Sequence, residues 1–293
     1  MRRLLIIGCG DVALRAVPQL RDRYRIYALT HSRQRVPLLR AHGMVPILGD
    51  LDDAASLEGL AGIAHDILHC APPPDRGTRD TRTAHLIAGL AKSKSLPQQL
   101  VYISTSGVYG DCAGELIDET RPLRPQTERA QRRVDAERQL REWGRRRRVC
   151  VSILRAPGIY SEQRLPLERL KSGTPALNAD EDAYTNHIHA DDLARVAVAA
   201  LRFGQPGRAY NANDDSRLKM GEYFDLVADR FGLPRPRRVS RTEASVRIPS
   251  NVLSFMHESR RLSNRRIKLE LRLKLRYPTV DDGIAAGRSQ PRF

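Results

Sequence analysis

Several features that would define other classes of protein are scarce in this sequence of 293 residues. No apolar run approaches the roughly 20 residues that a membrane-spanning helix needs. The run in the opening MRRLLII stops at Gly8, which is too short for a secretion signal. The four cysteines, Cys9, Cys70, Cys112 and Cys150, stand far apart without a Cys-x-x-Cys pair. This spacing disfavours a disulfide framework or a metal site and favours a reducing, cytoplasmic setting.

Aromatic residues (5%) are also scarce, and the 34 acidic residues are outnumbered by 50 basic ones, for a net charge of +16. Nearly all of the basic residues are arginines spread along the chain, and they are densest in residues 257–276. Such a balance is compatible with nucleic acid, an anionic membrane face or an acidic small-molecule ligand. Few aromatic rings leave few stacking platforms for a single strand, so we favour a solvated basic surface over nucleic-acid binding. We expect no membrane partner.

The first 155 residues alternate short apolar runs with helical patterns. The runs lack the polar alternation of a half-exposed strand, which predicts a parallel sheet covered on both faces. The fold class is therefore α/β, a doubly wound (Rossmann) sheet. The expected strands are residues 4–7, 26–29, 45–48, 66–69, 100–104 and 149–154, and the expected helices are 12–20, 36–41, 54–60, 81–91 and 129–143.

Beyond residue 155 the pattern loosens, and we predict a smaller carboxy-terminal substrate lobe. The expected division is 1–160 for the Rossmann domain and 161–293 for the lobe, with a return strand near 208–212 that interleaves the two. Apolar and polar residues alternate over 267–277, which predicts a short strand preceded by a helix over 259–266.

A glycine-rich turn lies between the first strand and the first helix. Gly8-Cys9-Gly10-Asp11-Val12-Ala13 has the spacing G-x-G-x-x-A, an accepted form of the dinucleotide fingerprint. The first glycine allows the tight turn, the second lets the backbone approach a pyrophosphate, and Ala13 allows close packing of helix and sheet. The helix amino terminus then offers free N–H groups to the phosphates. We assign cofactor contacts to Gly8, Gly10, Asp11, Val12 and Ala13.

The end of the second strand bears on the choice between NADP and NAD. An acidic residue there would hold the ribose 2′-hydroxyl of NAD, but none follows until Asp50. His31, Ser32 and Arg33, with Arg35 close by, could instead surround a 2′-phosphate. The sequence favours NADP, and NAD is the alternative. The competing structural explanation is that these arginines are merely exposed loop residues.

Two further strand ends carry candidate cofactor contacts. Asp50 and Leu51 follow the third strand, where an aspartate can accept a hydrogen bond from an adenine amine. Ala71 and Pro72 follow the fourth strand, where small rigid residues leave room for the cofactor. Ligands of open α/β sheets bind at these carboxyl ends.

The fifth strand closes in Tyr-Ile-Ser-Thr-Ser-Gly-Val-Tyr-Gly (102–110), and two later motifs are Leu-Arg-Ala-Pro-Gly-Ile-Tyr (154–160) and Asn-His-Ile-His-Ala-Asp-Asp-Leu-Ala (186–194). Together with the glycine turn, these segments resemble the extended short-chain dehydrogenase/reductases, the NAD(P)-dependent epimerase/dehydratase branch that acts on nucleotide sugars. The resemblance covers nearly the whole chain. It implies that Thr105 hydrogen-bonds the reacting group and that Ser104 contacts the cofactor. It also implies a homodimer paired through helices on the flank of the sheet.

The sequence departs from this family in its proton relay. The family has Tyr-x-x-x-Lys on the helix after the fifth strand, and the register set by Ala136-Glu137 places Arg129 and Arg133 there. Arginine does not release its proton at physiological pH, so Arg129 cannot replace a phenol. Arg133 could still donate hydrogen bonds to the cofactor ribose. Tyr109 is the first phenol past Thr105 and our candidate for moving the proton, although a purely structural role is the competing interpretation.

Ser104, Ser106 and His187 are other candidates for the proton. Ser106 and Gly107 stand where dehydratases carry acidic residues, which disfavours a 4,6-dehydratase. We assign substrate contacts to Ser106, Arg155, Arg164 and Asn186. The expected substrate is a phosphate-bearing, nucleotide-sugar-like molecule.

Two hypotheses remain for function. The first is an atypical NAD(P)-dependent oxidoreductase or epimerase in which Thr105, Tyr109 and Arg133 form the catalytic set. The second is a dinucleotide sensor or regulatory protein that kept the fold and lost catalysis.

Overall fold

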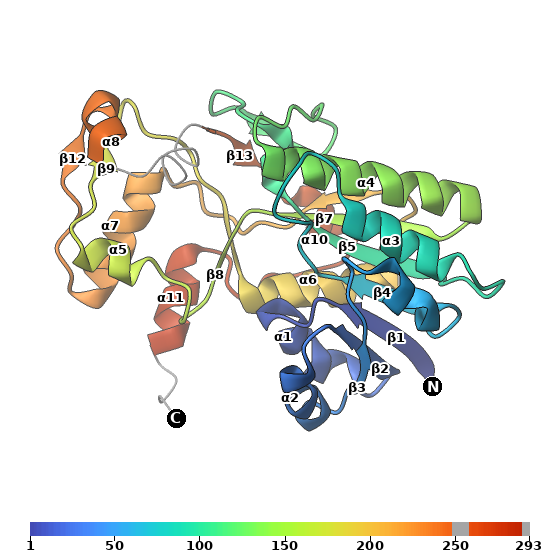
Figure 1. Ribbon diagram of the computed structural model, residues 1–293. Coiled ribbons are helices and arrows are strands. Elements are labelled where there is room, and N and C mark those ends of the chain that lie inside the picture. The colour runs from blue at the N-terminus through green and yellow to red at the C-terminus, as the bar shows by residue number, and fades with distance from the viewer. Residues whose placement is uncertain (248–257, 289–293) are drawn as a thin grey trace.

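Seven parallel strands form the central sheet of the computed structural model, which describes residues 1–247 and 258–288 (Figure 1). The strand order is β11-β7-β5-β4-β1-β2-β3, so the chain reverses direction across the sheet between β1 and β4. This order confirms the predicted doubly wound sheet. The strands are β1 (Arg2–Ile7), β2 (Tyr24–Thr30), β3 (Val45–Leu48), β4 (Asp66–His69), β5 (Gln99–Thr105), β7 (Cys150–Ala156) and β11 (Ala209–Asn211).

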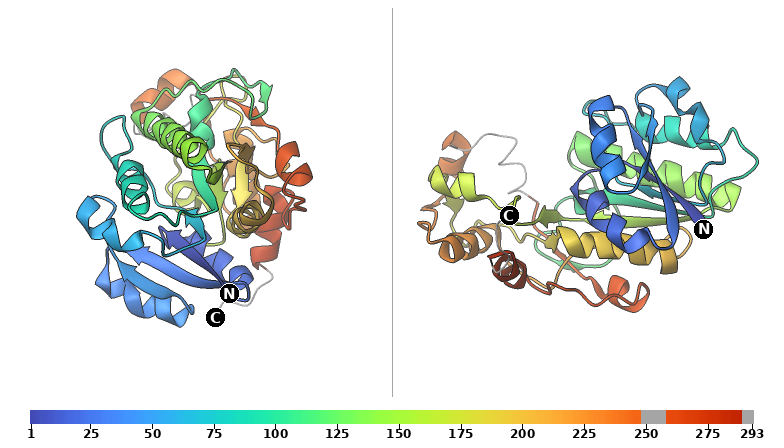
Figure 2. Two further views of the ribbon diagram at one scale, coloured as in Figure 1. Left: turned by 90° about the vertical axis from the view of Figure 1, so that its right-hand side faces the viewer. Right: turned by 90° about the horizontal axis from the view of Figure 1, so that it is seen from below.

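Helices cover both faces of the sheet (Figure 2). Along β1, Leu4 and Ile6 belong to the apolar core that includes residues of α1 and α6, whereas Leu5 and Ile7 belong to the core shared with α3 and α4. Both faces of the strand are buried, which explains why its sequence is continuously apolar. The helices of this region are α1 (Asp11–Leu20), α2 (Val36–Ala41), α3 (Thr81–Leu90), α4 (Glu128–Arg147) and α6 (Ala190–Phe203), with 3₁₀ helices η1 (Arg33–Arg35), η2 (Ala54–Leu60) and η3 (Ser106–Tyr109).

A smaller lobe lies beyond the carboxyl ends of the strands (Figure 1, left). It has its own apolar core, in which Tyr160, Tyr223, Phe224 and Val227 are buried together with Ile284. The paired strands β8 and β10 lead into it from the sheet. Its elements and the remaining short ones are β6 (Leu116–Ile117), β8 (Gly158–Tyr160), α5 (Leu167–Lys171), β9 (Ala176–Leu177), β10 (His187–His189), α7 (Met220–Phe231), β12 (Arg238–Val239), α8 (Arg241–Arg247), β13 (Arg261–Leu262), α10 (Arg265–Leu269) and α11 (Val280–Arg288).

Segments from the second half of the chain return to the sheet. β11 lies within the predicted return strand at 208–212 and pairs with β7, and α6 packs against α1. The exact division at residue 160 stays a prediction.

The prediction of a helix over 259–266 followed by a strand over 267–277 is wrong. The short strand β13 comes first, the helix α10 follows, and residues 270–277 form neither helix nor strand. Leu271, Leu273 and Leu275 are nevertheless buried in the core that contains α1 and α6. Their alternation therefore reflects an extended segment that lies on the core without pairing to a strand. The basic stretch predicted to begin at His257 starts outside the described residues.

A buried carboxylate holds this extended segment in place. Asp192, in the first turn of α6, is fully buried and accepts hydrogen bonds from the backbone N–H groups of Arg276 (2.9 Å) and Tyr277 (2.8 Å). Its Oδ1 also accepts from Arg195 Nη1 at 2.8 Å. The helix itself is capped by His189, whose side chain accepts from the Asp191 N–H.

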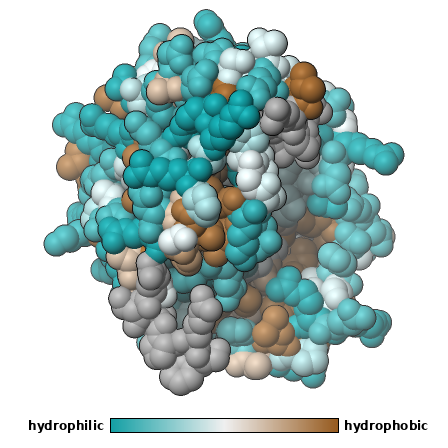
Figure 3. Space-filling view, turned by 90° about the vertical axis from the view of Figure 1, so that its left-hand side faces the viewer, coloured by the Kyte–Doolittle hydropathy of each residue, from teal (hydrophilic) through white to brown (hydrophobic). Residues whose placement is uncertain are grey.

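The surface on the side of the lobe is largely hydrophilic, with only small hydrophobic groups between the polar side chains (Figure 3). Within the described ranges, none of the helices combines the length and apolarity needed to cross a bilayer. All four cysteines carry free thiols.

We expect Asp192→Ala to lower the free energy of unfolding by about 3 kcal/mol, because it leaves two buried N–H groups and Arg195 without their acceptor. Chemical denaturation measures the loss, and Asp22→Ala, at an exposed position, is the control. Equal stability of the two variants would contradict this account of the segment.

Candidate active site

The glycine turn is shaped by its contact with the loop after β4. Gly8 has φ +83°, and an ideal Cβ there would lie 2.4 Å from the Ala71 backbone nitrogen. The carbonyl of Ile7 accepts hydrogen bonds from the N–H groups of both Cys70 (2.7 Å) and Ala71 (3.0 Å). No larger residue fits at this position, since both the backbone angle and the neighbouring strand exclude it.

Gly10 differs from Gly8 because the space in front of it is open. An ideal Cβ at Gly10 would have no heavy atom within 4 Å. The residue is the N-cap of α1 and provides no side-chain cap, so the first turn of this ten-residue helix keeps N–H groups for an outside acceptor. Open space beside a helix amino terminus fits the pyrophosphate of a dinucleotide.

A cavity of about 320 Å³ extends from this turn along the ends of β2, β3 and β4. Among the predicted cofactor residues, six line it: Gly8, His31, Asp50, Leu51, Ala71 and Pro72. Arg35 also lines it, and its Nη2 donates to the Cys9 carbonyl at 2.6 Å. Ser32 and Arg33 lie outside this lining, as do Val12 and Ala13 within α1.

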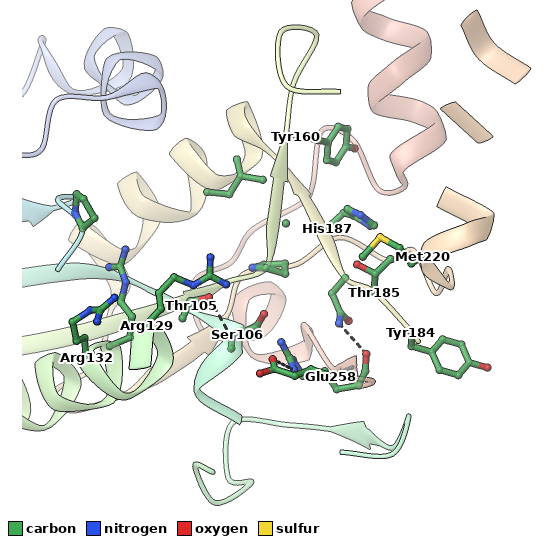
Figure 4. A pocket seen from close by; sticks show the side chains of 18 of the residues that line it. Thr105, Ser106, Arg129, Arg132, Tyr160, Tyr184, Thr185, His187, Met220 and Glu258 are labelled. Carbon is green, nitrogen blue, oxygen red and sulfur yellow. Dashed lines mark hydrogen bonds and ion pairs between the residues drawn. The ribbon is translucent and has the colours of Figure 1, made fainter. Parts of the chain in front are cut away.

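A second cavity of about 510 Å³ adjoins the first, and Pro72 lines both. Figure 4 shows this cavity with Arg129 and Arg132 on one side and His187 and Met220 on the other. The ends of β5 and η3 contribute Thr105, Ser106 and Gly107 between the two sides. The two cavities together form a path from the glycine turn to the lobe.

Thr105 ends β5 and caps η3. Its Oγ1 accepts a hydrogen bond from the Gly107 N–H at 3.3 Å, which leaves the hydroxyl proton for another acceptor. Ser106 and Asn186 also line the large cavity. Asn186 is tied to the segment around β13, since its Nδ2 donates to the Arg260 carbonyl and its Oδ1 accepts from the Leu262 N–H.

The two arginines at the expected Tyr-x-x-x-Lys positions both line the large cavity from α4. Arg133 Nη1 donates to the Tyr102 hydroxyl at 2.9 Å and to the Ile103 carbonyl at 2.8 Å. Burial lowers the pKa of Arg129, an effect that the charge of Glu258 opposes. Even so, the Arg129 guanidinium keeps its charge at neutral pH.

Three predicted site residues lie instead in a buried network behind the cavity. Arg155 is 2% exposed and pairs with Glu137 at 2.8 Å. Ser104 donates to the same carboxylate at 2.7 Å. Tyr109 donates to Asn211 Oδ1 at 2.7 Å and accepts from Arg155 Nη1.

This network corrects three of the sequence-based assignments. Burial raises the pKa of Tyr109 to about 12, and both atoms bonded to its hydroxyl are buried. The interior position removes Tyr109 from the candidates for moving a proton, Arg155 from the substrate contacts and Ser104 from the cofactor contacts. All three stabilise the fold beneath the cavity.

Arg164 lies near the glycine turn and outside the large cavity. Its Nη1 is 3.9 Å from Asp11 Oδ2, at the amino terminus of α1. Asp11 itself accepts from Arg15, which also pairs with Asp191 at the start of α6. Arg164 therefore lies beside the amino terminus of α1 and outside the lining of the large cavity, where a substrate contact was predicted.

Most of the cavity wall that the lobe contributes is formed by residues that no sequence motif indicated. Tyr160, Tyr184, Met220 and Tyr223 line this side, and Tyr223 stacks on His187 with ring centroids 4.1 Å apart. Burial lowers the pKa of His187 to about 3, so the imidazole is neutral. These residues come from separate segments, and no local motif connects them.

Glu258 and Arg260 were missed for a similar reason. They lie at the start of the second described range, 258–288, and form an ion pair of 2.8 Å at the cavity wall. Across the described residues, no group of three His, Cys, Asp or Glu side chains could hold a metal ion.

The order of the strands in the sheet and the glycine turn at the switch point define a doubly wound, dinucleotide-binding class of protein. The sequence profile of the NAD dependent epimerase/dehydratase family matches residues 9–212, and the chain belongs to this family. Members of this family bind NAD(P).

Solved structures of similar fold extend over almost the whole chain. A functionally unknown conserved protein from Silicibacter pomeroyi is 28% identical, with a TM-score of 0.80 and 99% of each chain covered. A dTDP-glucose 4,6-dehydratase from Streptomyces venezuelae, solved with NAD bound, is 22% identical, with a TM-score of 0.76 and 97% of this chain and 95% of the other covered. At that identity the second match shows the fold alone.

A curated relative matches a shorter part of the chain. The dTDP-D-glucose 4,6-dehydratase of Mus musculus is 24% identical over 131 residues, which is 42% of this chain and 37% of that protein. The match thus spans little more than a third of the relative.

We expect Gly10→Val to abolish dinucleotide binding and to leave thermal unfolding unchanged without nucleotide, because the new side chain enters open space. Differential scanning fluorimetry with and without millimolar NADPH and NADH measures both properties. Gly59→Val is the matched control, since an ideal Cβ there also meets nothing within 4 Å. Retention of the nucleotide-induced shift in Gly10→Val would contradict the assignment of the turn.

Proposed function

We propose that this chain is an NADP(H)-binding protein that acts on a phosphate-bearing, sugar-like substrate without the phenolic proton relay of its family. The observation that carries the proposal is the pair of adjoining cavities, which run from Gly8 past Pro72 to Thr105. When bound, the dinucleotide would supply hydride transfer. Two proteins of similar fold are a UDP-glucose 4-epimerase and a UDP-glucuronic acid 4-epimerase, which supports a nucleotide-sugar substrate.

NADP is favoured by the residues around the end of β2. His31 and Arg35 line the smaller cavity. The first acidic residue after β2 is Asp50, which follows β3 and lines the same cavity. A guanidinium can bind a 2′-phosphate through two hydrogen bonds, whereas the 2′-hydroxyl of NAD calls for a carboxylate.

Thr105 and Arg133 have distinct tasks in this proposal. The Thr105 hydroxyl, oriented by the Gly107 N–H, donates to the reacting oxygen of the substrate. Arg133, anchored at Tyr102 and Ile103, donates its remaining N–H groups to the ribose hydroxyls of the dinucleotide. Ser106, which lines the cavity, or water transfers the proton. Dehydration of the substrate is disfavoured because Ser106 and Gly107 provide no carboxylate.

The alternative is a dinucleotide sensor without catalysis. Its support is that the first phenol after Thr105 along the chain, Tyr109, is buried in the network with Arg155 and Asn211. Pairing of two copies through helices on the flank of the sheet stays a prediction under either hypothesis.

Wild-type protein should bind NADPH more tightly than NADH, and Arg35→Ala should weaken NADPH binding about tenfold through the loss of a charge-assisted contact. NADH affinity should stay within about twofold, since only NADPH carries the 2′-phosphate. Isothermal titration calorimetry measures both, with Arg40→Ala, an exposed position on α2, as the control. Equal losses for the two nucleotides would instead assign Arg35 a structural role through the Cys9 carbonyl.

Turnover is tested by following the nicotinamide absorbance with nucleotide sugars, sugar phosphates and simple carbonyls. We expect one of these classes to react and Thr105→Val to lower kcat about 100-fold with NADPH affinity unchanged. Thr120→Val, at an exposed position, is the control. Tight dinucleotide binding without turnover across the whole panel would favour the sensor.

A further inference from the structure

The large cavity has a strongly cationic side. Four arginines line it, of which Arg129, Arg132 and Arg133 come from α4 and Arg260 from the segment before β13. Among the described residues, only two carboxylates, Asp75 and Glu258, line the same cavity. Among the described residues that line the cavity, guanidinium groups therefore outnumber carboxylates by four to two.

The hydrogen bonds show which arginines are compensated. Glu258 accepts from Arg260 Nη1 at 2.8 Å, so this pair is close to neutral. Arg133 Nη1 bonds only to uncharged groups, the Tyr102 hydroxyl and the Ile103 carbonyl. Arg132 Nη1 donates to the Gly77 carbonyl, and its nearest carboxylate, Glu128, is 3.7 Å away and exposed.

Burial makes this arrangement costly without an outside anion. Arg132 is 6% exposed, and its Nε has no hydrogen-bond partner among the described residues. Arg260 Nε is also buried and also has no hydrogen-bond partner among the described residues. The carboxylate beside Arg132 is exposed and 3.7 Å away, so an oxyanion at the buried guanidinium would offset part of its desolvation penalty.

The opposite side of the cavity is uncharged. Tyr223 and His187 stack there, His187 is neutral, and Met220 and Tyr184 complete the wall. In Figure 4 the two sides face each other across Thr105 and Ser106. This one-sided polarity can orient a ligand that is anionic at one end and apolar or ring-shaped at the other.

We propose that the α4 side is an oxyanion subsite, so that the substrate carries a carboxylate or phosphate at the end next to Thr105. Arg129, at the position where the family has its phenol, and Arg132, on the same helix, contact this group. The inference rests on the proposed function, and it narrows the substrate to molecules that are acidic at the reacting end.

The test compares ligand pairs that differ only in that charge, with saturating NADP⁺ and at low ionic strength. UDP-glucuronate against UDP-glucose probes a carboxylate, and glucose 6-phosphate against glucose probes a phosphate. Calorimetry should show the acidic member of at least one pair binding about tenfold more tightly. The preference should weaken as salt is raised.

Variants of α4 test which arginines cause the preference for the acidic ligand. Arg129→Gln should reduce the preference to within about twofold, and Arg129→Lys should retain part of it because the charge is kept. Arg145→Gln, an exposed arginine on the same helix outside the cavity, should retain the full preference. Thermal unfolding of each variant verifies that the fold is intact.

Equal affinity for both members of each pair would overturn the inference, as would an acid preference that survives in Arg129→Gln. Either result with normal NADP⁺ binding leaves the proposed function standing. Loss of NADP⁺ binding by the wild-type protein would instead overturn the proposed function itself.

Discussion

The geometry of the candidate site depends on how closely β1 approaches the loop after β4. The Ile7 carbonyl accepts hydrogen bonds from two N–H groups of that loop. The next residue must be glycine, because its φ is positive and because a Cβ would collide with Ala71. This contact forces the chain to turn sharply before α1 begins. Gly10 then faces open space at the switch point of the sheet, where the strand order reverses. A larger side chain at Gly8 would separate the turn from β4 and displace the amino terminus of α1.

A second constraint fixes the other end of the path. The buried pair of Glu137 and Arg155 ties α4 to β7, and Ser104 and Tyr109 complete the network from β5 and η3. A buried ion pair of this kind contributes little net stability, but losing one partner is strongly destabilising, so the network sets where α4 lies. Because Arg129 and Arg133 are on the same helix, their position over the cavity follows from this pair.

The sheet and the glycine turn were predictable because their signals are local. Buried parallel strands are continuously apolar, and the G-x-G-x-x-A spacing has one structural context between a strand and a helix. Tyr109 and Arg155 were misassigned because nothing in the sequence near them shows that they bond to each other and to Glu137. The aromatic wall was missed because Tyr160, Tyr184 and Tyr223 meet only through tertiary folding. The alternation over 267–277 was misread because burial alone produces the same pattern as strand pairing.

The arginines of this chain show that residue type does not determine role. Arg155 is buried and neutralised by Glu137, and the arginines that pair with exposed carboxylates contribute little to stability. Arg132 and Arg133, on the cavity side of α4, differ because their hydrogen bonds go to carbonyls and a phenol, and the carboxylate nearest to Arg132 is exposed. The net charge of +16 therefore says little about the site, since most of that charge is solvated. The local excess of guanidinium over carboxylate in one cavity is what points to an acidic ligand.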